Sequence, residues 1–281
     1  MAVWRNYQTL DGAFDMMKRH RFSPIHMIHV GYVGLALFFL QLPVIVVVLA
    51  SLTETSYLTI PPKGLTLKWY TVVLSDTVYL DAVWTSLQLA VAAMVLSLAL
   101  GTAASYALIR RKVRFASLLS SIFMAPLVFP AVVVGVALLQ FFTLVGIRGQ
   151  FIALILAHVA ITVPYVIRSV LATMAGNDFA VEEAARTLGA NGWTAFRLVT
   201  FPMIRPGLVA GGLFSFIISF DNVPVTIFLL NVRDTTLPIK IFTAIEHGVD
   251  PSIAAISSIL IIITGLFLVL AERWVGFHKF A

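Results

Sequence analysis

The residues that could do chemistry in this chain are few, and the most prominent is an acid inside an apolar run. Asp221 follows Ser219 and Phe220 and precedes Asn222 within a long hydrophobic stretch. Leaving a carboxylate in hydrocarbon is costly, so its side chain should face a polar pathway or a partner helix. Pro224 removes the backbone donor that would meet the Phe220 carbonyl, which adds a polar, flexible point. The pattern predicts a pathway residue that attracts a cation or, equally, a hydrogen-bonded packing or gating residue.

Two other kinds of side chain could serve a pathway. His158 is a lone histidine in an apolar run, and such a residue is expected to be hydrogen-bonded inside a helix bundle, with a proton relay as the alternative. Phe214, Phe216 and Phe220 are spaced to stack on a cation. In a chain with 21 phenylalanines, packing against lipid or the core is the default interpretation.

Covalent and metal chemistry have no supporting pattern. The chain has no cysteine, and we find no GxxxxGK[ST] phosphate loop, no His/Cys metal spacing and no Ser/His/Asp set. We therefore expect no catalytic residue, no cofactor, no metal site and no ATP site. The net charge of +6 does not indicate nucleic acid, because the basic residues lie at the ends of apolar runs, where they set membrane topology.

A polar stretch between two apolar runs predicts a pair of short helices. Asn177-Asp178 offers an N-cap, and Glu182 and Glu183 then lie near the positive end of the helix dipole. Gly189 is placed to end this helix as a C′ residue. Asn191 can cap a second helix that Pro202 should end. The apolar residues expected to pack back onto the other helices are Trp193, Phe196, Val199 and Phe201.

The rest of the chain reads as membrane helices. It is 60% hydrophobic and 11% charged, whereas soluble domains carry about 25% charged residues. Six apolar runs approach the ~20 residues that a spanning helix needs, so we predict an all-α membrane protein with six transmembrane helices. The runs are 30–52, 84–109, 118–144, 150–170, 206–230 and 253–271. Internal prolines predict kinks or breaks in several of them.

The basic residues also predict an orientation. If the N-terminus is cytoplasmic, fourteen Lys and Arg residues fall on that side and five on the other, which favours both termini inside. The cytoplasmic ones are Arg5, Lys18, Arg19, Arg21, Arg110, Arg111, Lys112, Arg114, Arg168, Arg186, Arg197, Arg205, Arg273 and Lys279. We accordingly divide the chain into a cytoplasmic segment 1–29, a six-helix domain 30–271 with a cytoplasmic loop 171–205, and a cytoplasmic tail 272–281.

The polar loop resembles the cytoplasmic signature of binding-protein-dependent ABC importer permeases. That signature runs Glu-Ala-Ala, three residues, Gly, nine residues, Ile, one residue, Leu-Pro. Here Glu183-Ala184-Ala185, Gly189 and Pro202 match at that spacing, with Val199 for Ile and Phe201 for Leu. The resemblance implies the type I importer permease fold, with a coupling helix between helices four and five that docks on an ATPase subunit. The coupling residues it implies are Glu182, Glu183, Ala184, Ala185, Arg186, Gly189 and Pro202.

The stretch from Ser219 to Asn222 also resembles the fifth helix of the second permease of spermidine/putrescine importers, which reads Ser-[Phe/Leu]-Asp-Asp. Asn222 replaces the second acid. This resemblance implies a multi-pass bacterial inner-membrane protein that carries a polyamine or related organic cation, with Ser219, Phe220, Asp221 and Asn222 in the pathway. It implies as partners the bilayer, ATP-binding cassette ATPase subunits, a homologous second permease in a heterodimer and an external solute-binding protein, and no nucleic acid. The alternatives are an importer of an opine, amino compound, iron or oxyanion, or a self-sufficient secondary transporter.

Overall fold

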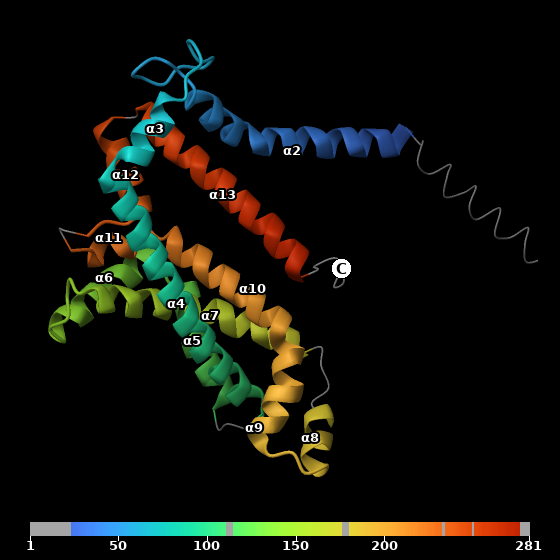
Figure 1. Ribbon diagram of the computed structural model, residues 1–281. Helices are drawn as coiled ribbons and strands as arrows, with labels where there is room; N and C mark the ends of the chain where they lie inside the picture. Colours follow the sequence, from blue (N-terminus) through green and yellow to red (C-terminus); the bar gives the residue numbers. More distant parts are fainter. Residues whose placement is uncertain (1–23, 111–114, 176–179, 232–233, 249, 276–281) are drawn as a thin grey trace, which may run out of the picture.

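A computed structural model of the chain describes residues 24–110, 115–175, 180–231, 234–248 and 250–275. These ranges are helical apart from turns and short connections (Figure 1). The predicted cap at Asn177-Asp178 and most of the two predicted terminal segments lie outside the described residues. The helices are α2 Pro24–Ala50, α3 Lys68–Ser75, α4 Thr77–Arg110, α5 Ala116–Val128, α6 Ala131–Leu144, α7 Phe151–Ala175, α8 Ala180–Thr187, α9 Gly192–Ala195, the π-helix η1 Phe196–Thr200, α10 Phe201–Phe220, α11 Thr226–Leu229, α12 Leu237–His247 and α13 Pro251–Val275.

Most of the predicted apolar runs form helices long enough to cross a membrane. Within the described ranges four qualify, namely Met27–Ala50, Thr77–Ile109, Phe151–Ala175 and Gly192–Phe220. The predicted run 118–144 is two helices, α5 and α6, bent by 107°. The break falls at Phe129 and Pro130, because a proline cannot donate to the preceding turn. The apolar part of α13, Pro251–Leu266, is shorter, so the spans number four, or five with the bent pair, and a count of six stays a prediction.

The core of the bundle is formed by α4, α7 and α10, which all pack against one another, and α7 is the most buried of the three. Glycines allow both neighbours to approach it closely. A Cβ at Gly101 of α4 would lie 2.7 Å from the Val166 Cβ, and one at Gly211 of α10 would lie 2.9 Å from the Val166 Cα. One turn away, a Cβ at Gly207 would lie 2.7 Å from the Ser169 carbonyl oxygen. Gly207 and Gly211 form a GxxxG pair, a spacing that brings membrane helices into backbone contact. The sequence contained this signal, and our prediction did not use it.

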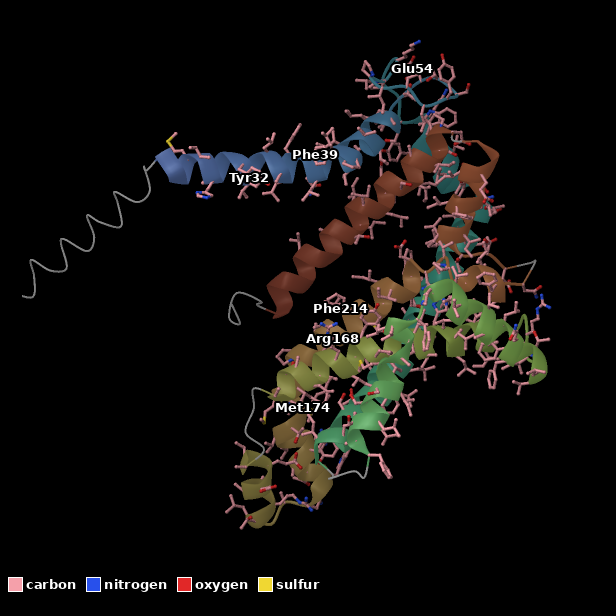
Figure 2. The ribbon with its side chains drawn as sticks, turned by 180° about the vertical axis from the view of Figure 1, so that it is seen from behind. Tyr32, Phe39, Glu54, Arg168, Met174 and Phe214 are labelled. Atoms are coloured by element: carbon pink, nitrogen blue, oxygen red, sulfur yellow. The ribbon has the colours of Figure 1, made fainter. Side chains whose placement is uncertain are left out.

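Helix α2 stands apart from this core. It extends sideways from the bundle, and Tyr32 and Phe39 project from it far from the other helices (Figures 1 and 2). These two side chains are 72% and 71% exposed, whereas Ala50 at the C-terminal end is buried. The helix therefore joins the bundle only near its C-terminal end, where it contacts α13. Most of its apolar surface is left for lipid or another protein.

Candidate functional site

The polar stretch forms the first of the two predicted short helices, α8, and a tight turn joins it to α9, which is the first turn of a longer continuous helix. Gly189 has φ +96°, a left-handed conformation that favours glycine. The Gly189 amide donates to the Arg186 carbonyl, and the Ala190 amide donates to the Ala185 carbonyl; together these bonds make a Schellman ending. The Asn191 side chain accepts from the Thr194 amide at 2.8 Å. The predicted Gly189 ending and Asn191 cap are both confirmed.

The predicted stop at Pro202 is wrong. The chain runs without a break from Gly192 through η1 and α10 to Phe220. In η1 the backbone adopts i→i−5 bonding, and the Phe201 amide donates to the Phe196 carbonyl. Within this wider turn the backbone departs from the i→i−4 hydrogen-bonding pattern. Pro202 follows directly, at one of the first two positions of α10, where the missing N–H donor of a proline is tolerated. Such π-turns within α-helices occur frequently at functional sites.

Glu182 ties this turn to the membrane helices. It was predicted to share the docking surface with Glu183, but its side chain is only 2% exposed while that of Glu183 is exposed. The Tyr106 hydroxyl of α4 donates to Glu182 Oε1 at 3.0 Å. The Thr200 hydroxyl of η1 donates to the other carboxylate oxygen, Oε2. A buried carboxylate needs such donors, and these come from two different elements. We call the Tyr106–Glu182–Thr200 set the inner tie.

Aromatic packing strengthens the same junction. The Phe196 ring contacts the Tyr106 ring edge-on, with the two ring centroids 5.3 Å apart. This contact with α4 confirms the prediction that Phe196 packs onto the bundle. Trp193 was expected to do the same, yet it is 69% exposed and stacks on Phe196 at 5.9 Å. The stack borders an apolar cleft of about 1240 Å³ between α4, α9 and α10. Arg186, one of the predicted coupling residues, also lines this cleft.

The second polar group lies at the opposite end of α10. Asp221 ends that helix as its C-cap, and its side chain is exposed. Asn222 Oδ1 accepts from the Val225 amide at 2.9 Å, so its side chain stabilises the turn that follows. The backbone is non-helical here until α11 begins at Thr226, as a proline at position 224 favours. We call residues 221–225 the outer break.

The other two predicted pathway residues are turned inward. Ser219 is 2% exposed and bonds to His158 Nδ1 at 2.8 Å. Phe220 is half-buried and stacks on Phe216 at 5.9 Å. Of the four predicted residues, only Asp221 has an exposed side chain, which makes it the best placed to meet a solute.

His158 is a hydrogen-bonded residue inside the bundle, as predicted. Its ring is fully buried, and Nε2 lies 3.0 Å from the Thr226 hydroxyl. One imidazole therefore joins α7 to both α10 and α11. No pattern in the sequence indicates Thr226, or Tyr106 and Thr200 of the inner tie, because the role of each residue depends on tertiary contacts.

Long apolar helices, glycine-mediated packing and polar groups at both ends of α10 define a multi-pass membrane protein with the features of a transport subunit. The family model "Binding-protein-dependent transport system inner membrane component" matches residues 97–279. The chain belongs to this family, and it is a permease subunit of an ABC importer.

Curated relatives cover most of the chain. It is 32% identical to "Spermidine/putrescine transport system permease protein PotC" of Haemophilus influenzae, across 83% of this chain and 91% of that protein. It is 31% identical to "Putrescine transport system permease protein PotI" of Escherichia coli K12, across 81% and 83% of the two chains. The match to each relative therefore extends into the region before residue 97, which the family model leaves out.

A solved structure supports the fold. The chain superposes with a TM-score of 0.71 on a chain of "a bacterial ABC transporter involved in the import of the acidic polysaccharide alginate". The alignment covers 90% of this chain and 98% of that one at 19% identity. At this identity the likeness concerns the fold alone.

Proposed function

We propose that this chain is one permease of a polyamine importer and forms half of the translocation pathway for putrescine, spermidine or a related organic cation. The observation that carries the proposal is Asp221, an exposed carboxylate at the end of an apolar helix. Two relatives that cover most of the chain are named for spermidine and putrescine transport. A carboxylate at membrane depth is costly unless it serves a pathway or a partner, and attraction of an ammonium group is chemistry that suits this placement.

The substrate is tested by uptake into vesicles that contain the complete importer. We expect saturable, ATP-dependent uptake of radiolabelled putrescine or spermidine, and Asp221→Asn should reduce it at least about tenfold, because losing one charge-assisted hydrogen bond costs about 1.5–3 kcal/mol. Asp234→Asn is the matched control, since Asp234 is an exposed acid beyond the outer break. The substrate assignment would be refuted if the importer took up neither polyamine but did take up another amino compound, an opine, iron or an oxyanion.

The α8–α9 turn is the part of this chain that we propose docks on the ATPase. Glu183 and Ala184 are exposed on α8, and Gly189 leaves space at the turn because nothing lies within 4 Å of its added Cβ position. Small exposed residues permit close approach by a partner surface. Glu182 then transmits movement from within, through the inner tie to α4 and η1, while Glu183, Ala184, Ala185, Arg186 and Gly189 present the docking side.

The same proposal includes the assembly and topology expected from the sequence. ABC ATPase subunits, a homologous second permease and an external solute-binding protein complete the importer. The six spans have both termini in the cytoplasm, and the exposed side of α2 is available to the second permease or to lipid. Uptake by vesicles that contain this chain alone would instead identify a self-sufficient secondary transporter.

A further inference from the structure

His158 bonds to residues on both sides of the outer break. Ser219 lies two residues before Asp221, and Thr226 is the first residue of α11. One ring nitrogen bonds to each hydroxyl, at 2.8 and 3.0 Å. All three side chains are buried, at 0–2% exposure. A single imidazole therefore spans the segment that carries the only exposed predicted pathway residue.

The direction of each hydrogen bond follows from the proton count. Thr226 donates its one hydroxyl proton to the Asn222 carbonyl, so it can only accept at His158. Nε2 must then carry the ring proton and donate to Thr226, while Nδ1 accepts from the Ser219 hydroxyl. This neutral tautomer satisfies every side-chain hydrogen-bonding group of the set. The chain of bonds continues from the imidazole through Thr226 to the backbone of Asn222.

The surroundings hold both the imidazole and the outer break in place. Thr162 of α7 donates to the His158 carbonyl and bonds to Ser97 of α4 at 2.7 Å, which anchors the helical turn that carries the histidine. Helix α6 also approaches the outer break, because a Cβ at Gly135 would lie 3.0 Å from the Pro224 carbonyl oxygen and 3.2 Å from the Val225 Cα. The outer break is therefore packed against α6 and bonded to the imidazole through the residues that flank it.

We propose that His158 is a positioning residue for the outer break, which it holds in the one conformation that places Asp221 and Asn222 at the end of α10. It does not touch the solute and does not relay protons. Its link to selectivity rests on the proposed role of Asp221, whereas its hold on the backbone does not. Ser219 and Thr226 belong to the same device.

The hold on the backbone is tested with a single introduced thiol in the complete importer in vesicles. Val225 is fully buried in the outer break. The chain has no cysteine, so Val225→Cys gives this chain a single thiol, at the outer break. The rate of its reaction with a water-soluble maleimide measures how often the break opens. Loss of two hydrogen bonds, each contributing about 1 kcal/mol, predicts an increase of about tenfold or more in that rate for His158→Leu.

Three further variants keep the test decisive. His158→Gln retains a donor and an acceptor, so it should restore much of the protection. Ser219→Ala removes only the bond to His158 Nδ1, with little change of volume, and should raise the rate about fivefold. Ser105→Ala is the control, because Ser105 is equally buried and bonds to Gly101 and Ile167, away from the outer break; its rate should not change. Equal rates in all variants, or an equal increase in the control, would overturn the proposal.

Uptake then shows whether the histidine acts through the acid. In the complete importer with putrescine as the probe, His158→Leu should reduce uptake, and it should cause little further loss in an Asp221→Asn background. Additive losses would mean that His158 acts elsewhere. If Asp221→Asn alone has no effect, the proposed function fails at Asp221, and the maleimide rates still decide whether His158 holds the outer break.

Discussion

Removing the Tyr106 hydroxyl should weaken the link between α8 and the membrane helices while leaving their packing intact. Tyr106→Phe deletes the donor to Glu182 Oε1 but keeps the ring against Phe196. The carboxylate stays buried and still accepts from Thr200. The change therefore removes a hydroxyl donor from the inner tie and leaves the ring in place.

The expected size follows from the charge on the acceptor. A hydrogen bond to a charged group contributes about 1.5–3 kcal/mol. If α8 exchanges between a seated and a released position of similar free energy, losing that energy shifts the equilibrium about 10- to 150-fold toward release. Most cycles of ATP hydrolysis would then fail to move α4, although the ATPase would still bind the exposed side of α8.

The assay measures ATP hydrolysis and solute uptake in the same vesicles containing the assembled importer. We expect Tyr106→Phe to reduce uptake per ATP hydrolysed at least about fivefold, with co-purification of the ATPase unchanged. Tyr165→Phe is the control, since Tyr165 of α7 also stacks on a phenylalanine, Phe214. Unchanged uptake per ATP, or an equal loss in the control, would refute the inner tie as the link.

Three further substitutions, one of them with a matched control, test other parts of the molecule. Glu183→Lys should abolish co-purification with the ATPase but leave membrane insertion and thermal stability unchanged; normal binding would remove Glu183 from the docking surface. Gly211→Val should lower the melting temperature of the purified protein, because it forces α10 away from Val166. Gly34→Val is the control and should not lower it, because Gly34 lies in open space on α2. Equal melting temperatures of the two variants would contradict the close approach of α10 to α7. Asn191→Ala should destabilise the α8–α9 turn by about 1 kcal/mol, seen as faster proteolysis between the two helices.

The sequence predicted the elements with local causes. Apolar runs identified the long helices, and Pro130 and Pro224 lie where the backbone breaks. Gly189 and Asn191 end and begin helices as their types require. Each of these signals acts within a few residues of the feature that it determines, so no knowledge of the fold was needed.

The errors concern features that depend on distant residues or on backbone register. Pro202 was expected to end a helix, but the π-turn before it accommodates the proline. Glu182 and Glu183 are neighbours of the same type, and only contacts with α4 and η1 decide that one is buried. The pathway role of Ser219 stays a prediction, but its bond to a histidine 61 residues away was not predicted. Periodicity along one segment cannot reveal such pairings.

Helix α10 has a polar anchor at each end, the inner tie beside Thr200 and the His158 contact at Ser219. Its 20 residues make a rod about 30 Å long, at 1.5 Å per residue. For a rod of that length, a tilt of about 10° around one end displaces the other by about 5 Å, comparable to one helical turn. Leverage of this kind needs no bending along the helix. On the proposed function, a small rotation imposed at α8 would displace the Asp221 end of α10 by a distance of this order.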